Sequence, residues 1–290
     1  MNKRCKLIYI YLLVCEMYST ILAQEVQRLS NNCRPKFTDE EAITCYLFAL
    51  LEQKQNVKSV HGFICEYWGE WFPNLPSYAQ FTKQINFLAP AIEMFAKNLI
   101  YRNFKADNME FLLDSMPIVI ANAKRSRTAR VAHELCDKGY CASKNMYFYG
   151  VKLHGLLQAQ SHKLPKMHAF RVEPASRSDL TVGKELLQTA ENLTVYADKA
   201  YIDATWREEL SQQNVRLLTP IKLKKGEKAL NAADALWSRA VSSVRQPIES
   251  FFAWLQDKTQ IQRASKVRSE SGLIAFIFAR IAVAAILFFN

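Results

Sequence analysis

The sequence is poor in residues that interrupt regular structure, and it contains no recognisable linker. Only 8 glycines and 9 prolines occur among its 290 residues. No long stretch rich in Gly, Ser or Pro, no internal repeat and no low-complexity tract is found. Repeat architectures and disordered chains are therefore excluded, and the length suits one large domain or two modest ones.

The cysteines form no pattern typical of a disulfide framework or a zinc site. There are 7 of them, an odd number, and no Cys-x-x-Cys pair exists. His133, Cys136 and Cys141 are close in sequence, but no fourth zinc ligand accompanies them. We therefore expect scattered, reduced thiols.

Both ends of the chain contain apolar runs that imitate export or membrane signals. Residues 3–23 carry basic residues before a short apolar run, as a secretory signal does, but Glu16 interrupts the run. An N-terminal helix with one apolar face is the competing interpretation, and we favour it over a cleaved segment. Residues 272–289 could span a membrane by length, yet Arg280 lies mid-run, where charge is costly in lipid. We expect a core helix packed on a sheet, with Arg280 reaching solvent or a carboxylate.

The chain is strongly basic, with a formal net charge of +11, and 50% of its residues are hydrophobic. The apolar fraction is ample for a core. The basic residues gather in runs at 124–130, 222–225 and 263–268. Such a run is often only a solvated surface. Because all three flank the acidic residues described next, we favour contact with nucleic-acid phosphate.

Three carboxylates stand where an acid is costly unless it binds a cation. Asp114 lies in the apolar run 111–120, which predicts a buried strand, and Asp198 closes a second such run, 193–198. Glu249 lies in residues 241–258, whose apolar positions recur at helical spacing, and Arg245 shares its face. Burying unpaired charge costs many kcal/mol, and carboxylate oxygens suit Mg²⁺ or Mn²⁺. The pattern predicts a metal site.

The order of elements predicts an α/β fold. After the first strand come strands at 147–160 and 167–173, a helix at 178–191 and the strand that ends at Asp198. A helix at 203–213, a strand at 215–220 and the Glu249 helix follow. This order is that of an RNase H-like mixed sheet flanked by helices, with its acids on the first strand, the fourth strand and the closing helix. We assign it to residues 106–290.

Residues 1–105 are expected to be entirely helical. Thr38 begins a capping box before an amphipathic helix, 57–71 forms a second candidate, and Ser77 caps a third. The three helices suit either a helix-turn-helix-like DNA-binding region or a structural cap. The aromatic residues within 67–72 could stack on bases, but at helical spacing they are more often core.

Several segments resemble the DDE transposases of bacterial insertion sequences, and most closely the insertion sequence 982 group. They are Leu-Asp-Ser-Met-Pro-Ile (113–118), Gly-Tyr-Cys-Ala-Ser-Lys (139–144), Tyr-Gly-Val-Lys-Leu-His (149–154), Ala-Asp-Lys-Ala-Tyr-Ile (197–202), Leu-Leu-Thr-Pro (217–220) and Arg-Gln-Pro-Ile-Glu-Ser-Phe-Phe (245–252). The similarity extends from about residue 75 to the C-terminus. Asp114, Asp198 and Glu249 match the catalytic triad of that family, and Arg245 matches the arginine before its glutamate.

The resemblance implies a transposase that cleaves DNA and transfers strands by two-metal-ion phosphoryl transfer. Mg²⁺, with Mn²⁺ as a substitute, would be held by Asp114, Asp198 and Glu249. The partner would be double-stranded DNA, both element ends and target, bound by a homodimer or higher multimer in the cytoplasm with the nucleoid. The expected DNA-binding residues are Lys124, Arg125, Arg127, Arg130, Lys199 and Arg245. Lys152 and His154 share one face of their strand and could approach the phosphate near the metals, but we favour a satisfied structural histidine at His154.

The chain departs from the related patterns at four positions. Ser242 and Gln256 replace a tyrosine and a lysine near the glutamate, and Ala197 and Ala200 replace glycines beside the second aspartate. Two alternatives therefore stay open. One is a catalytically impaired or domesticated DNA-binding relative, and the other is a metal-dependent nuclease without strand transfer.

Overall fold

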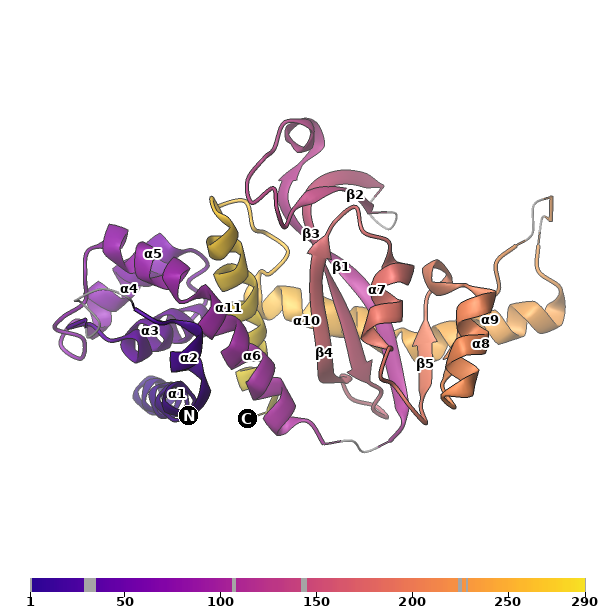
Figure 1. Ribbon diagram of the computed structural model, residues 1–290, viewed down its shortest axis with the longest axis horizontal. Helices are drawn as coiled ribbons and strands as arrows, with labels where there is room; N and C mark the ends of the chain where they lie inside the picture. Colours follow the sequence, from indigo (N-terminus) through magenta and orange to yellow (C-terminus); the bar gives the residue numbers. More distant parts are fainter. Residues whose placement is uncertain are drawn as a thin grey trace. The chain divides into compact units, whose positions relative to one another are not determined.

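The computed structural model describes residues 2–28, 35–105, 108–141, 145–223, 226–227 and 229–289. Lys224 and Lys225 of one basic run lie outside the described residues. The chain divides into two compact units (Figure 1). The first comprises Met1–Asn103, Val131–Glu134 and Leu255–Asn290, and the second comprises Phe104–Arg130 and Leu135–Trp254.

The first unit is helical. Its elements are α1 (Lys3–Met17), the π-helical turn η1 (Tyr18–Leu22), α2 (Ala23–Glu25), α3 (Asp39–Leu51), α4 (Val57–Trp68), α5 (Tyr78–Phe87), α6 (Ala89–Asn103) and α11 (Glu270–Phe289). The helical character expected of residues 1–105 is confirmed. The capping box of α3 is present, since Thr38 Oγ1 accepts from the backbone N–H of Glu41 and Glu41 accepts from that of Thr38. The Ser77 side chain caps α5.

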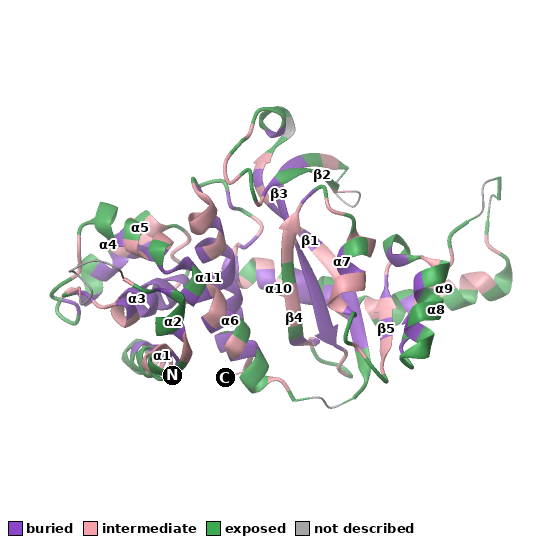
Figure 2. Ribbon diagram, viewed as in Figure 1, coloured by how far each residue is buried: buried purple, intermediate pink, exposed green. Residues whose placement is uncertain are grey.

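The C-terminal helix packs with these helices rather than on a sheet. α11 contacts α6, α3 and α5, and most of its residues are buried (Figure 2). Residues 255–290, which we placed with the catalytic region, thus group with the N-terminal helices. The expected core helix is confirmed, but the expected packing on the sheet is wrong.

Arg280 is also placed differently from the expectation that it reaches solvent or a carboxylate. Its side chain is buried in the first unit. The guanidinium donates to the backbone carbonyls of Thr259 (2.9 Å), Phe276 (3.0 Å) and Gln55 (2.6 Å). It also lies over the Phe276 ring, 3.5 Å from its centroid. Three carbonyl dipoles and an aromatic face therefore compensate the buried charge.

Among the residues that the structure describes, two helical segments are long and apolar enough to cross a membrane by length and composition alone, Lys3–Glu25 and Glu270–Phe289. Within the described residues, 72% of the apolar window of α11 is buried, against 28% of the N-terminal window. α1 has one buried face, formed by Leu7, Ile10, Val14 and Met17. α1 contacts α3, while the apolar side chains of Ile8, Tyr11 and Leu12 on its other side are exposed.

The second unit contains a six-stranded mixed sheet. Its strands are β1 (Glu110–Asn122), β2 (Asp137–Cys141), β3 (Met146–Gln158), β4 (Lys166–Pro174), β5 (Thr194–Ala197) and β6 (Arg216–Leu218). β2 and β4 pair with successive parts of β3, β3 is antiparallel to β1, and β5 and β6 continue the sheet parallel to β1. This order, β4-β3-β1-β5-β6, is the RNase H-like topology that we expected. β2 was not predicted as a strand, because it is mostly exposed and has no apolar alternation.

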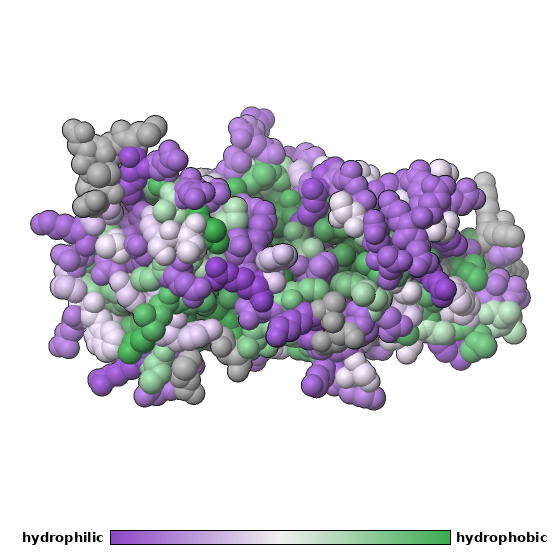
Figure 3. Space-filling view, turned by 60° about the horizontal axis from the view of Figure 1, so that its bottom comes forward, coloured by the Kyte–Doolittle hydropathy of each residue, from purple (hydrophilic) through white to green (hydrophobic). Residues whose placement is uncertain are grey.

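Helices cover the two faces of this sheet within the second unit. α7 (Asp179–Leu186) and α8 (Ala204–Gln212) belong to the side whose core includes Leu113, Val195 and Ala197. α10 (Pro247–Thr259) crosses the other side, where Phe251 stacks on Phe170 of β4 at 6.3 Å (Figure 1). Polar side chains cover much of the molecular face drawn in Figure 3, with smaller apolar areas between them.

The single helix expected over residues 241–258 is in fact two helices. α9 (Ala232–Arg245) begins earlier, and α10 follows it after Gln246. Pro247 has no N–H to continue the hydrogen-bond ladder, so the helix is interrupted there, and proline is well suited to the first position of α10. Glu249 consequently lies in the first turn of a helix, where a negative charge is favourable.

Candidate active site

Asp114 and Asp198 occupy equivalent positions on adjacent parallel strands. Leu113 of β1 pairs with Ala197 of β5, and each aspartate is the next residue along its strand direction. The backbone at Asp198 is still extended. Leu113 and Ala197 belong to the core on the α7 and α8 side. Because successive side chains alternate between faces, both aspartates point to the opposite face.

Glu249 lies on α10, and an aromatic contact between α10 and β4 holds this helix against the same face of the sheet. Asp114 pairs with Gly155 of β3, and Gly155 pairs with Phe170 of β4, so the three residues form one row across the sheet. A Cβ atom at Gly155 would lie 3.1 Å from the Phe170 ring, so glycine leaves room for that ring. Phe170 stacks on Phe251, two residues after Glu249. The glycine and the ring pair thus set the position of the helix that carries the third acid.

Arg245 joins the first and third acids. Its Nη1 donates to Asp114 Oδ2 at 2.5 Å, and its Nη2 donates to Glu249 Oε1 at 2.6 Å. The Arg245 side chain is 14% exposed, Asp114 21% and Glu249 59%. The pairing of Arg245 with Glu249 was expected from their spacing, whereas the contact with Asp114 was not.

The electrostatic state of Asp114 reflects its burial. Desolvation raises the pKa of Asp114 from 3.8 to about 6, and the neighbouring Asp198 and Asp179 act in the same direction. The Arg245 guanidinium and the Ser115 backbone N–H, which donates at 2.8 Å, oppose this rise in pKa. A carboxylate in this position is short of compensating positive charge.

A second polar cluster lies on the α7 face, behind Asp114. Asp179 Oδ1 accepts from Lys152 Nζ at 2.9 Å and from Ser115 Oγ at 3.2 Å, and it lies 4.0 Å from His154 Nδ1. Ser115 follows Asp114 on β1 and pairs with His154 of β3. The cluster therefore ties the strand that carries Asp114 to the start of α7. Sequence reasoning missed Asp179, because an acid at the start of a helix is ordinarily explained by the helix itself.

This arrangement changes the interpretation of Lys152 and His154. They do share one face of β3, as predicted, but it is the α7 face and not the face of Asp114. His154 is fully buried, and neither ring nitrogen makes a hydrogen bond within the described residues. The expectation of a satisfied structural histidine is therefore wrong. Burial lowers the pKa of His154 to about 4, so the ring is neutral.

The remaining basic residues singled out from the sequence are at the surface. Lys124, Arg125 and Arg127 lie in the 3-10 turn η2 (Ala123–Arg127) that directly follows β1, and all three are exposed, as is Arg130. Lys199 is exposed in the 3-10 turn η3 (Lys199–Tyr201), where its backbone N–H donates to Asp198 Oδ1 at 2.6 Å. Of the six, Arg245 alone is held by carboxylates among the described contacts.

The donor chemistry of the three acids fits a hard divalent cation. Carboxylate oxygens are the ligands that Mg²⁺ and Mn²⁺ prefer, and the raised pKa of Asp114 marks a buried acid that a cation would stabilise. Within the described residues, no three His, Cys, Asp or Glu side chains are grouped closely enough to hold one ion. His133, Cys136 and Cys141, which we considered as zinc ligands, are likewise not grouped in this way. Asp114 and Glu249 meet through the Arg245 guanidinium instead.

Comparisons with known proteins identify the family of this chain. The family described as Transposase DDE domain matches residues 109–287, which is more than half of the chain. No match is found among curated proteins. The solved structures include a similar fold in the piggyBac transposase synaptic complex with hairpin DNA, with 10% sequence identity, a TM-score of 0.50, and coverage of 98% of this chain and 74% of that one. The chain belongs to the DDE transposase family.

Proposed function

We propose that this protein cleaves the ends of an insertion sequence and joins them to target DNA, as a bacterial transposase of the insertion sequence 982 type. The main support is the parallel register of β1 and β5, which places Asp114 and Asp198 directly after the last paired residues, Leu113 and Ala197. Arg245 donates hydrogen bonds to both Glu249 and Asp114, and so links the third acid to the first. The solved transposase with a similar fold is a complex with DNA, which supports DNA as the partner.

Asp114, Asp198 and Glu249 would hold the divalent ions, with Mg²⁺ as the expected metal and Mn²⁺ as a substitute. When bound, such ions activate a water or a 3′-hydroxyl and stabilise the leaving oxygen of an in-line displacement. The attack of water on the phosphodiester bond at an element end leaves a free 3′-hydroxyl. Attack by that hydroxyl on a target phosphodiester forms the new bond and releases a target 3′-hydroxyl, so no covalent enzyme intermediate is needed.

The basic side chains that follow the two strands would bind the DNA backbone. Lys124, Arg125, Arg127 and Arg130 follow the strand of Asp114, and Lys199 follows Asp198 directly. Their exposed positions suit contacts with phosphate. Arg245 would serve as a counter-ion in the metal-free site and as a phosphate contact once the acids bind metal.

We further propose a nucleoid-associated protein of the cytoplasm that acts as a homodimer or higher multimer on two DNA ends. The burial of α11 among the helices of the first unit supports its role as a core helix in a folded chain. Recovery of a form that begins near Gln24, or extraction only by detergent, would contradict this localisation.

One assay tests the proposed function. The purified chain is incubated with labelled DNA from both ends of the element that encodes it, a plasmid target and Mg²⁺. We expect nicked ends and joined end–target products, both lost in EDTA and in Asp114→Asn. Nicking without joined products would favour the nuclease, and binding without nicking would favour the impaired DNA-binding relative.

A further inference from the structure

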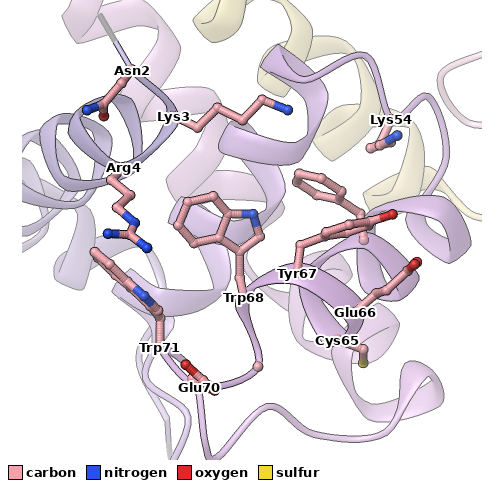
Figure 4. Close-up of a pocket in the computed structure, with 12 residues that line it drawn as sticks. Asn2, Lys3, Arg4, Lys54, Cys65, Glu66, Tyr67, Trp68, Glu70 and Trp71 are labelled. Atoms are coloured by element: carbon pink, nitrogen blue, oxygen red, sulfur yellow. The ribbon is translucent and has the colours of Figure 1, made fainter.

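The first unit contains a groove that the catalytic proposal does not use. Its volume is about 990 Å³. It is formed by the start of α1, the turn before α4, and the end of α4 with the residues that follow (Figure 4). Aromatic rings line its centre and cationic side chains its edge, so its chemistry differs from that of the carboxylate site.

The aromatic residues within 67–72 divide into two kinds. Trp68 and Phe72 are buried, as expected for core residues, whereas Tyr67 is 65% exposed and Trp71 is 43% exposed. Trp68 packs edge-on against Phe48 at 5.1 Å and against Trp71 at 5.6 Å. The exposed Trp71 ring is therefore held by a ring that is fixed in the core. The exposed Tyr67 ring packs on Phe63 at 5.5 Å, so the groove has two separate surface rings, each held by another ring and each open to a stacking partner.

The cations at the groove edge suit an anionic ligand. Arg4 is exposed and has no ion pair within the part of the chain that the structure describes, and Figure 4 shows its guanidinium directed toward Trp71. Lys54 lies over the Phe63 ring at 5.1 Å. Lys3 is 63% exposed although it pairs with Glu52 at 2.9 Å. These three cations disfavour a cationic ligand such as an ammonium group, which an aromatic cage would otherwise suit.

The groove also limits the length of an anionic ligand. Glu66 and Glu70 lie in its lining, and their charges would repel a long run of phosphates. A duplex offers no free base face for stacking, because its bases are already stacked on one another. A ligand with one or two phosphates and an exposed aromatic face fits both observations, and an unpaired nucleotide has these properties.

We propose that this groove binds one or two unpaired nucleotides of a DNA strand, with bases stacked on Tyr67 and Trp71 and phosphate contacted by Arg4 and Lys54. The proposal rests on the proposed function only in taking DNA as the partner. Transposition exposes unpaired nucleotides at cleaved strand ends, and the groove gives the helical unit a means of holding them. Stacking makes the contact tolerant of base identity.

The test measures binding by the full chain in EDTA, so that no cleavage is required. The probe is a fluorescein-labelled oligo(dT) of about ten nucleotides, compared with an abasic strand of equal length and with a blunt duplex. We expect Tyr67→Ala/Trp71→Ala to weaken oligo(dT) binding by at least ~10-fold while duplex binding changes by less than about twofold. Arg4→Gln should weaken oligo(dT) and the abasic strand alike, because it removes a phosphate contact.

Matched variants separate the groove from the general surface. Tyr101→Ala removes an aromatic ring of the same unit that is 81% exposed, and Lys83→Gln removes an exposed charge; neither residue lines the groove. If the double alanine variant loses its helical signal, Tyr67→Leu/Trp71→Leu keeps apolar volume and replaces it.

The proposal would be overturned if the double variant bound oligo(dT) as wild type does, if the double variant lost as much binding to the abasic strand as to oligo(dT), or if Tyr101→Ala lost as much oligo(dT) binding as the double variant. Preferential binding of an acidic peptide by the same groove would also overturn it. Failure here leaves metal-dependent cleavage untouched. If the labelled-end assay shows no cleavage, the oligo(dT) assay can still be interpreted, because it requires no cleavage. The two proposals are therefore tested independently.

Discussion

Arg245 Nη1 lies 2.5 Å from Asp114 Oδ2, although the two residues are 131 positions apart. The same guanidinium holds Glu249. One cation thus compensates a buried aspartate and links two of the three acids expected to bind metal. This contact lowers the pKa of Asp114, but burial and the neighbouring carboxylates of Asp198 and Asp179 outweigh it, so the pKa still rises to about 6.

The first prediction is that Arg245 competes with metal for these oxygens. Arg245→Gln should raise the affinity for Mn²⁺ on the order of tenfold near pH 8, because it removes a cation that occupies the same carboxylates. Titration calorimetry measures this without DNA. Arg239→Gln, an exposed arginine of α9, is the control. Equal or weaker Mn²⁺ binding by Arg245→Gln would show that the guanidinium does not compete.

The second prediction concerns the acids themselves. Asp114→Asn, Asp198→Asn and Glu249→Gln should each abolish nicking of element ends, because each removes an anionic ligand with little change in volume. DNA binding and the circular dichroism spectrum should stay close to wild type. Asp257→Asn, an exposed acid on the same helix as Glu249, should retain activity. Near wild-type nicking by any of the three would show that residue to be misassigned.

The third prediction follows from the pKa of Asp114, which burial raises to about 6. The folded state holds this proton more tightly than the unfolded chain, so the associated stability is present below about pH 4 and is lost as pH rises through about 6. The unfolding free energy of wild type relative to Asp114→Asn should therefore fall by up to about 3 kcal/mol across this range.

Urea unfolding in EDTA from about pH 4.5 to 8 measures this difference. The lowered pKa of His154 acts in the opposite direction, but it is present in both proteins and cancels in the comparison. A difference that does not change with pH would mean that Arg245 fully offsets the burial of Asp114.

The fourth prediction concerns the basic run after β1. Duplex binding should weaken linearly in the logarithm of salt concentration. Lys124, Arg125 and Arg127 changed together to Gln should reduce that slope by roughly 0.9 for each phosphate group that the protein no longer neutralises. The control is a triple variant that removes the same charge from other exposed positions, by changing Lys83, Lys163 and Arg239 to Gln. Identical salt slopes for the two triple variants would mean that residues 124–127 are an ordinary solvated surface and do not bind DNA phosphate specifically.

The fifth prediction concerns Arg280 in the first unit. Arg280→Met should destabilise the protein by about 3 kcal/mol, because it removes the side-chain donor to the carbonyls of Thr259 and Gln55, whereas the Phe276 carbonyl keeps its helical N–H partner. Thermal and urea unfolding measure the loss, and Arg263→Met, at an exposed position, should be nearly neutral. A stability equal to wild type would mean that other donors or water satisfy these carbonyls.

The sequence by itself determined the elements whose cause is local. Apolar runs predicted β1 and β5, and the four-residue spacing of Arg245 and Glu249 predicted their ion pair, although the two residues lie on separate helices, α9 and α10. The Thr38 capping box and Ser77 marked the starts of two helices, and both were found. These features depend on residues within a few positions of one another, so the pattern of neighbours carries the information.

Tertiary structure alone decided which distant groups meet. The pairing of Leu113 with Ala197 aligned the two aspartates, and the contact of Phe170 with Phe251 brought α10 to them. Burial then determined which hydrogen-bond partners the polar residues have. Neighbouring residues in the sequence do not determine whether a polar side chain is buried. Arg280 found backbone carbonyls instead of solvent, and His154 became buried without a hydrogen bond. Desolvation and long-range contact depend on the packing of whole elements, which no local pattern contains.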